Sequence, residues 1–328
     1  MKRPIDLRRY RPHTLQLSLP AGQTLALAAV LLVVSVVVIE VALRIPAIQS
    51  RLPAPSVRSQ YLDFEVKLQR LREMERVDCV FLGSSIVNRG LSPADFEQGY
   101  QTATGQPITC FNFGVGGAGE NTGVLLADYV MKVYHPSLLV FGVSPRLGSG
   151  GGKGPLAELP WIKYQQGVFS LHGWLVEHSA LYGYGRSLAE ALTGMPNSGR
   201  RMFFDRMILA NGFYMDNAVI EFPITPSERE RIERSNYAVD DVWLGRLDEM
   251  MAFHQPPQTQ VVIVEMPVHP VALDDYEDML RDYAESISVI TARAEAKGVP
   301  FFATSRRLDV LAANENWLDF NHLNATGA

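Results

Sequence analysis

The chain has 328 residues, of which 47% are hydrophobic and 20% charged, with a formal net charge of −5. This composition excludes a disordered protein, and the length is enough for one large domain or two small ones. The first 44 residues carry six basic side chains against two acidic ones, which leaves a net charge of about −9 on the remainder. An acidic body argues against nucleic acid as a partner, because phosphate binding needs a basic face.

One segment near the N-terminus, from residue 21 to residue 43, is almost entirely apolar. About 20 helical residues are enough to cross a bilayer. Basic side chains precede the segment, so the positive-inside rule predicts a cytoplasmic tail over residues 1–20, a transmembrane signal anchor over 21–43 and an extracytoplasmic remainder, periplasmic or extracellular. The alternative is a cleaved signal peptide, but the apolar core is long for one, and Ala42-Leu43-Arg44 is a poor cleavage site.

Residues 44–76 are interpreted as a juxtamembrane spacer followed by a helix. Pro46, Pro53 and Pro55 are typical of a spacer that lifts a domain off the membrane. Apolar residues at helical spacing between residues 61 and 76 predict a helix that leads into the first strand. The main domain is therefore predicted over residues 77–328.

Short apolar runs alternate with helical patterns along this main domain. The predicted strands cover residues 77–82, 108–113, 137–143, 260–266 and 300–304, and helices are expected from residue 92, over 121–133 and over 274–297. This alternation predicts an α/β fold of the flavodoxin-like three-layer α/β/α type, with a parallel sheet of about five strands. Between residues 148 and 237 the alternation lapses, and we interpret this aromatic-rich stretch as an inserted, mainly helical cap. Its aromatic side chains form either a small secondary core or a surface for stacking sugars.

The chain has two cysteines, Cys79 and Cys110, each inside a predicted strand. Two cysteines cannot form a disulfide framework or a metal cluster, and the favoured interpretation is that both are small buried apolar residues. Export would nonetheless permit a bridge between them. The sequence has no set of His, Cys and carboxylate residues at zinc spacing, so no metal or other cofactor is expected.

Two polar motifs stand at strand ends. Gly83-Ser84-Ser85 ends the first predicted strand, and Asp319 precedes His322 by three residues after the last one. In open parallel sheets the carboxyl ends of the strands meet at one edge, where ligands bind. In a catalytic triad a histidine takes the proton of a serine, while an acid fixes the histidine tautomer. Glycine and serine are also ordinary turn formers, so the first motif alone is weak evidence.

Together these motifs resemble the conserved blocks of the SGNH, or GDSL-type, serine hydrolases. Gly83-Ser84-Ser85-Ile86 is similar to the first block, Asn112-Phe-Gly-Val-Gly-Gly117 to the second, and Asp319-Phe-Asn-His322 to the fifth. The resemblance implies catalytic roles for Ser85, Asp319 and His322. It also implies that the backbone N–H groups of Ser85 and Gly117 form an oxyanion hole.

The third block of the family is not reproduced. Where the family usually has Gly-x-Asn, with the asparagine amide donating to the oxyanion, this chain has Gly142-Val-Ser144-Pro-Arg146. Ser144 is therefore the candidate third donor, with Asn88 or Arg146 as substitutes, and an ordinary turn is the alternative. Losing one oxyanion donor can cost about 100-fold or more in rate. Asn88, Arg146 and His269 are also possible substrate-binding residues.

The single N-terminal span is similar to that of membrane-tethered family members that act in polysaccharide O-acetylation or teichoic-acid D-alanylation. This resemblance implies a serine esterase or O-acetyltransferase that acts on an O-acyl group, above all O-acetyl, of a cell-surface polysaccharide or an acylated small molecule. It implies a multispanning membrane acyltransferase as a partner. The alternative is a weakly active or inactive scaffold of the same fold that binds polysaccharide. Relatives usually continue into a closing helix after this histidine, so that helix is expected to be absent or to lie beyond residue 328.

Overall fold

The structure is a computed structural model that describes residues 21–49, 51–52, 55–57, 59, 61–117, 121–145, 154–193, 196–221, 224–233, 237, 239–272, 277–304 and 313–328. The chain forms two compact units, residues 1–51 and residues 52–328. The predicted tail over residues 1–20 lies outside the described residues.

The first unit contains helix α1 (Ala21–Ala42) and the short helix α2 (Pro46–Gln49). Residues 22–42 form a helix that is long and apolar enough to cross a membrane, and none of it is buried. At 1.5 Å per residue, α1 is about 33 Å long, which matches the roughly 30 Å hydrocarbon core of a bilayer. Glu40, the one charged residue of α1, pairs with Arg44 at 2.6 Å near the end of the helix.

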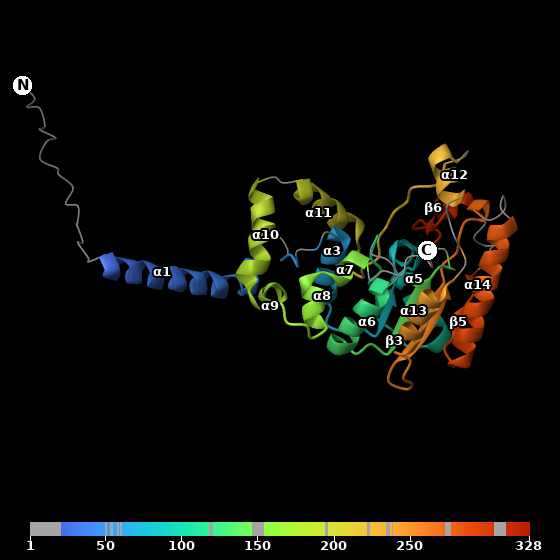
Figure 1. The fold of residues 1–328 in the computed structure, drawn as a ribbon, viewed down its shortest axis with the longest axis horizontal. Coiled ribbons are helices and arrows are strands. Elements are labelled where there is room, and N and C mark those ends of the chain that lie inside the picture. The colour runs from blue at the N-terminus through green and yellow to red at the C-terminus, as the bar shows by residue number, and fades with distance from the viewer. Residues whose placement is uncertain are drawn as a thin grey trace, which may run out of the picture. The chain divides into compact units, whose positions relative to one another are not determined.

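A five-stranded sheet forms the centre of the second unit (Figure 1). Its strand order is β2-β1-β3-β4-β5, and every neighbouring pair is parallel. This is the flavodoxin-like order, so the predicted α/β class and strand number are confirmed. The strands are β1 (Cys79–Leu82), β2 (Cys110–Asn112), β3 (Leu138–Val143), β4 (Gln260–Glu265) and β5 (Phe301–Phe302).

Helices cover the sheet on both faces. Alternate residues of a strand point to opposite faces, so Val80 and Phe81 mark the two sides. The larger core contains Val80 and packs against α3 (Leu62–Arg72), α6 (Asn121–Val133), α13 (Asp241–Met251) and α14 (Glu277–Ala296). The smaller core contains Phe81 and packs against α4 (Ser85–Gly90) and α5 (Pro93–Thr104). These layers explain why the strands appear in the sequence as nearly continuous apolar runs.

Over β3 to β5, the α4–α5 face of the sheet forms a groove of about 560 Å³. Phe302, on β5, is 64% exposed. Most of the side chains that line the groove are apolar, including Phe81, Leu91, Phe96, Tyr100, Val140, Val262, Val264 and Phe302.

Helix α3, which precedes β1, lies inside the core of the second unit rather than on its surface. Phe64, Leu68 and Leu71 are buried in the larger core. Asp63 and Lys67, one turn apart, are buried with them. The sequence assigned this helix to the juxtamembrane region, whereas its side chains belong with residues 52–328.

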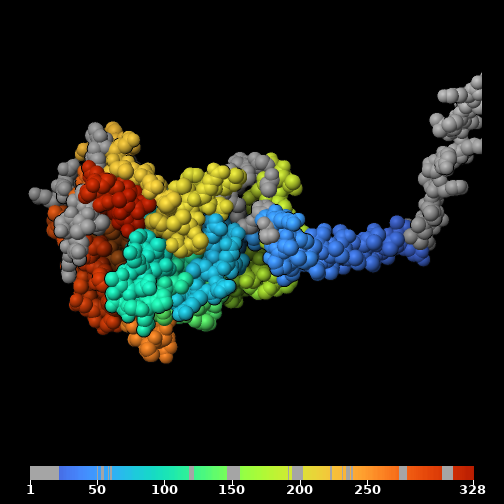
Figure 2. Space-filling model, turned by 180° about the vertical axis from the view of Figure 1, so that it is seen from behind, coloured from blue at the N-terminus to red at the C-terminus, as the bar shows by residue number. Residues whose placement is uncertain are grey.

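The segment between β3 and β4 is mainly helical in its described residues, as predicted. Its aromatic residues partly join the main core, because Trp161 lies 5.9 Å from the Phe64 ring and 5.0 Å from the Tyr129 ring. Figure 2 shows α11 against α3, where Arg70 pairs with Asp205 at 2.8 Å. The helices are α7 (Gly154–Ala157), α8 (Pro160–Gln165), α9 (Leu171–His178), α10 (Ala180–Thr193), α11 (Pro196–Met207) and α12 (Pro226–Glu233).

After β5 the chain forms a 3-10 turn over Asn314–Asn316 and a small antiparallel hairpin of β6 (Trp317–Asp319) and β7 (His322–Leu323). Asn324 anchors the residues that follow, donating its side-chain amide to the carbonyl oxygens of Glu315 at 2.7 Å and Ala218 at 3.2 Å. Its backbone N–H donates to the Asn316 carbonyl at 3.0 Å. The histidine of the second motif is therefore held firmly although it lies near residue 328.

Cys79 and Cys110 are both buried and both free. They are direct register partners on β1 and β2. Burial raises the pKa of the Cys79 thiol well above its usual value, and the neighbouring Cys110 raises it further. The two residues therefore serve as small buried side chains, which was the favoured interpretation.

Candidate active site

The turn that carries Ser85 is set by close packing between β1 and α4. Gly83 ends the strand with φ of 155°, and a Cβ atom there would lie 2.5 Å from Val87 Cγ2 and 2.9 Å from the Gly142 carbonyl oxygen. Only glycine fits without displacing α4. Ser84 precedes the helix, and its carbonyl accepts the N–H groups of Val87 and Asn88. Ser85 therefore stands at the first position of α4, at the carboxyl edge of the sheet.

The β6–β7 hairpin carries Asp319 and His322 opposite this turn. His322 Nδ1 lies 2.9 Å and 3.0 Å from the two carboxylate oxygens of Asp319. Asp319 Oδ1 also accepts the backbone N–H groups of Asn321 at 2.8 Å and His322 at 3.0 Å. Burial raises the pKa of Asp319, but the bonds and charge of His322 and the backbone donors outweigh it and lower the pKa to about 2. The carboxylate is therefore ionised at neutral pH.

Ser85 and His322, 237 residues apart in sequence, are in direct contact. The Ser85 Oγ atom lies 2.8 Å from His322 Nε2. The Asp319 carboxylate can accept a hydrogen bond but cannot donate one, so the proton of the neutral imidazole lies on Nδ1. This leaves Nε2 free to accept the serine proton. The three predicted catalytic residues thus form one hydrogen-bonded chain in the order required for nucleophilic catalysis.

The loop after β2 lies against the serine turn. The backbone N–H of Val115 donates to the Gly83 carbonyl at 3.0 Å. Gly114 permits this approach, since a Cβ atom there would lie 2.5 Å from the Asn88 backbone nitrogen. Asn112 donates its side-chain amide to the carbonyl oxygens of Val87 at 2.7 Å and Leu91 at 2.8 Å. The loop and the helix that carries Ser85 are therefore fixed to each other.

Lys67 of α3 holds this loop through hydrogen bonds from its buried side chain. Its ammonium group donates to the Gly114 carbonyl at 2.7 Å, and to the carbonyl and side-chain oxygens of Asn112 at 3.0 Å and 3.1 Å. The side chain is fully buried. Burial lowers the pKa of Lys67, and the negative charge of Asp63 opposes this. No role of Lys67 could be predicted, because a lysine in a charged helix carries no signal that would identify one.

Asp63, also on α3, reaches the same loop closer to Ser85. Its Oδ2 atom accepts the backbone N–H of Gly116 at 2.6 Å and the side-chain amide of Asn88 at 3.4 Å. Burial raises the pKa of Asp63, while the Gly116 N–H and the charge of Lys67 lower it less strongly. A carboxyl group thus occupies one backbone donor of the second block, a feature that the motifs did not reveal.

A cavity of about 220 Å³ opens beside Ser85. Arg89, in its wall, lies 3.4 Å from the Asp216 carboxylate and 4.8 Å over the Tyr214 ring. Phe204 and Tyr214 bring aromatic rings from the inserted segment to the cavity. The lining residues are Tyr61, Leu62, Asp63, Ser85, Asn88, Arg89, Gly116, Phe204 and Tyr214.

The remaining predicted oxyanion residues lie outside this lining. Gly117 follows the lining residue Gly116, and its carbonyl accepts the Tyr61 hydroxyl at 3.3 Å. Ser144 is buried directly after β3, next to β1 in the sheet. The structure therefore brings both to the edge of the sheet that carries Ser85.

The predicted substrate-binding residues have different positions. Asn88 lines the cavity, and its Oδ1 atom is buried with no hydrogen-bond partner among the described residues. Arg146 lies outside the described residues. His269 is buried away from the cavity lining; its Nδ1 accepts the Val271 N–H at 3.1 Å and its Nε2 lies 3.1 Å from Asn314 Oδ1. Its position supports the β6–β7 hairpin, because its backbone N–H donates to the Phe320 carbonyl.

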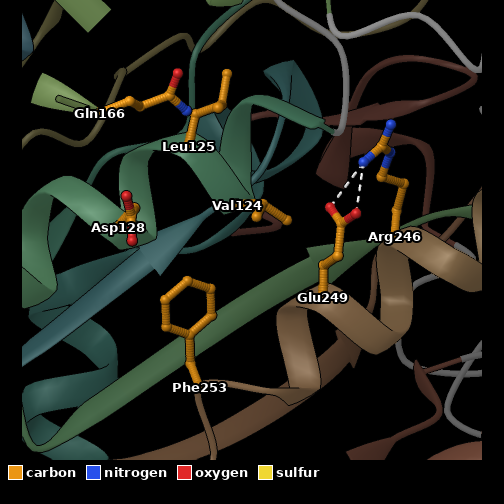
Figure 3. Close-up of a pocket in the computed structure, with 7 residues that line it drawn as sticks. All are labelled: Val124, Leu125, Asp128, Gln166, Arg246, Glu249 and Phe253. Carbon is orange, nitrogen blue, oxygen red and sulfur yellow. Dashed lines mark hydrogen bonds and ion pairs between the residues drawn. The ribbon is translucent and has the colours of Figure 1, made fainter. Parts of the chain in front are cut away.

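A second cavity, of about 260 Å³, lies between α6 and α13 (Figure 3). Its one arginine, Arg246, is held by Glu249 at 2.7 Å and 2.8 Å. None of the triad residues lines this cavity, so we assign it no chemistry. The side chains drawn are Val124, Leu125, Asp128, Gln166, Arg246, Glu249 and Phe253.

Fold and site together define an α/β protein with a Ser–His–Asp chain at the carboxyl edge of a parallel sheet. No family model, curated protein or solved structure matches this chain. A function therefore has to be inferred from the geometry and chemistry of the site.

Proposed function

We propose that this protein is a serine esterase or acyltransferase that works through an acyl-serine intermediate. The observation that supports the proposal is the chain from Ser85 Oγ to His322 Nε2, at 2.8 Å, and from His322 Nδ1 to the Asp319 carboxylate, at 2.9 Å. The motif resemblance to SGNH-type hydrolases supports the same assignment.

In the proposed reaction Ser85 Oγ attacks the carbonyl carbon of an ester while His322 Nε2 takes the hydroxyl proton. Asp319 stabilises the imidazolium, and the backbone N–H groups of Ser85 and Gly117 stabilise the oxyanion, with the Ser144 hydroxyl as the third candidate donor. The tetrahedral intermediate collapses, and the alcohol leaves with the proton from His322. Water or an acceptor hydroxyl then attacks acyl-Ser85 and gives its proton to His322, which returns it to Ser85.

The cavity beside Ser85 suggests the class of substrate. Carboxyl, amide and guanidinium groups from Asp63, Asn88 and Arg89 share its wall with the aromatic rings of Phe204 and Tyr214. Such a mixture suits a hydroxyl-rich sugar unit better than a long acyl chain. We therefore propose an O-acetyl group on a cell-surface polysaccharide as the substrate, with a multispanning membrane acyltransferase as the source of acyl groups.

The proposed location follows from α1. A helix of this length and composition, preceded by a basic segment, would anchor the chain in a membrane with the N-terminus in the cytoplasm. The serine site would then act outside the cytoplasm. An extracytoplasmic site is where a cell-surface polysaccharide would be reached.

The reaction is tested with the full chain in nanodiscs and an activated acetyl ester, with and without an oligosaccharide. Release of acetate in both arms indicates a hydrolase, and acetylated oligosaccharide indicates a transferase. Ser85→Ala should abolish turnover, whereas the matched control Ser84→Ala should retain it. Full activity of Ser85→Ala would overturn the proposal.

A second candidate function is a polysaccharide-binding scaffold with little or no catalysis. It is favoured by the Asp63 carboxyl group that accepts the Gly116 N–H at 2.6 Å, and by the serine where the third block has an asparagine. This candidate predicts that the wild-type chain binds the oligosaccharide without turning over the ester, and that Ser85→Ala binds it equally well.

A further inference from the structure

Four exposed apolar side chains gather where α8 passes into α9. Val168, Phe169, Leu171 and Trp174 expose 56%, 75%, 63% and 41% of their surface. We call these four residues the α8–α9 patch. Single exposed apolar residues are ordinary, but several of them close together in one short stretch are typical of an interaction site.

Leu171 and Trp174 of the α8–α9 patch lie on α9, and Val168 and Phe169 lie in the connection that precedes it. Gly173 of α9 is buried against α8, since a Cβ atom there would lie 2.4 Å from the Pro160 carbonyl oxygen. His172 joins α9 to α10 through Nδ1, which lies 2.9 Å from the Tyr182 hydroxyl. The exposure of the patch is therefore built into the packing of three helices.

The stretch that holds the patch contains no charged side chain, and Lys163 and Glu177 border it. Residues 164 to 176 include no Asp, Glu, Lys or Arg. A charged group would make transfer into an apolar medium costly, and this stretch avoids that cost. Trp and Phe are also the aromatic residues that suit the boundary between lipid headgroups and acyl chains.

The chain that leads from α1 joins the second unit beside the same helices. The Ser56 backbone N–H donates to the Gly183 carbonyl at 3.1 Å, one residue from the Tyr182 that contacts α9. Residues 43 to 55 separate the end of α1 from Ser56. These 13 residues reach at most about 45 Å when fully extended, and the helical turn of α2 shortens that reach.

We propose that the α8–α9 patch docks on the lipid bilayer that α1 crosses, with Phe169 and Trp174 at the interface between headgroups and acyl chains. The inference rests on the proposed membrane anchoring by α1 and is independent of the serine chemistry. Docking adds a second attachment to the single-helix anchor. It fixes which side of the second unit faces the membrane.

The tryptophans of the chain provide a built-in probe. Trp174 is 41% exposed, whereas Trp161, Trp243 and Trp317 are at most 5% exposed. The full chain is reconstituted at low density into phosphatidylcholine and phosphatidylglycerol vesicles, with and without brominated acyl chains, which quench tryptophan on contact. We expect quenching of wild type that is lost in Trp174→Phe. The double variant Phe169→Ser, Leu171→Ser keeps Trp174 as the probe and should lose most of the quenching.

Further measurements separate docking of the patch from membrane anchoring by α1 and from the serine chemistry. Phe302→Ser removes an aromatic side chain that is 64% exposed on the sheet, and it should leave the quenching unchanged. Resistance to alkaline extraction tests α1 alone, and ester turnover tests the serine site alone. If α1 resists extraction and wild type is quenched no more than Trp174→Phe, docking is overturned. Dimers that form through the patch under the same conditions would instead assign it to a second copy.

Discussion

Ser84 and Ser85 are adjacent, yet their surroundings differ completely. The Ser85 hydroxyl contacts His322 Nε2 at 2.8 Å and lines the cavity. The Ser84 hydroxyl is buried and has no hydrogen-bond partner among the described residues. The extended backbone at Ser84 and the start of α4 at Ser85 turn the two side chains apart. Only the second serine can serve as the proposed nucleophile.

Gly83 is the residue on which the position of Ser85 depends most. Gly83→Ala should lower ester turnover about 100-fold, since a displacement near 1 Å is enough for such a loss. The added Cβ would lie 2.5 Å from Val87 Cγ2 and force α4 to move. Gly99→Ala on α5 is the matched control, because a Cβ there meets nothing within 4 Å. It should keep full turnover and gain up to about 1 kcal/mol of stability. Equal turnover in the two variants would contradict this account.

Asp319 links the proposed catalytic site to the acid stability of the fold. Its pKa falls from the ordinary 3.8 to about 2, so the folded state favours the ionised form. This contribution, about 2 kcal/mol, is fully present above about pH 5 and is lost as the pH falls from about 4 to 2. Thermal unfolding of wild type and Asp319→Asn should therefore differ at pH 7 and converge towards pH 2. Asp95→Asn, exposed on α5, serves as the control for general acid effects.

The same Asp319→Asn change should reduce ester turnover by about 10²- to 10⁴-fold at pH 7, because the imidazole loses the partner that fixes its tautomer. Turnover near the wild-type level would mean that the hydrogen-bonded chain has no catalytic role.

At the scale of elements, α3 is the support on which the site is built. Lys67 gives three hydrogen bonds to Asn112 and Gly114, and Asp63 holds Gly116 in the same loop. Residues from before the first strand therefore position a loop that follows the second. A substitution that loosens the packing of α3 should therefore displace this loop and, with it, Ser85.

Replacing Lys67 tests that support. Lys67→Met should lower the free energy of unfolding by about 3 kcal/mol or more, because it leaves buried oxygen atoms and the Asp63 carboxyl group without their cation. Lys132→Met is the matched control: Lys132 is 54% exposed and pairs with Asp128 at 2.9 Å, so its loss should cost less than about 1 kcal/mol. Thermal unfolding in detergent micelles measures both. Similar destabilisation by the two changes would contradict the role given to α3.

The sheet could be predicted from the sequence because its strands carry apolar side chains on both faces. Residues 138 to 143 and 260 to 265, for example, form nearly continuous apolar runs between helical patterns. The role of α3 could not be predicted, because its Asp63 and Lys67 look like surface charges. The loop residues that they bond lie 45 residues or more along the chain, and local periodicity says nothing about such contacts.

The proposed catalytic residues could be predicted from the places of their motifs along the chain. Ser85 follows β1 at the carboxyl edge of the parallel sheet, where such residues gather, and the β6–β7 hairpin beyond the last parallel strand brings His322 to it. His269 also follows a strand, but its ring packs at 5.2 Å from the Trp317 ring and bonds Asn314, away from the cavity lining. The position of a residue at a strand end does not tell which way its side chain turns.

At the scale of the whole molecule, the chain combines the apolar helix α1 with one compact unit of residues 52–328. The proposed orientation places that unit outside the cytoplasm. Leu192 is 85% exposed, whereas the native Cys79 and Cys110 are fully buried. Leu192→Cys should therefore react with a membrane-impermeant maleimide in intact spheroplasts, while wild type should not. Labelling of the variant only after lysis would reverse the orientation.

The central claim is that Ser85 is a nucleophile activated by His322. The most direct measurement is reaction of the full chain with a serine-reactive fluorophosphonate, followed by mapping of the adduct by mass spectrometry. We predict one adduct, on Ser85, which persists in Ser84→Ala and is lost or strongly slowed in His322→Ala. A folded wild-type protein that forms no adduct, or forms it on Ser84, would contradict the account.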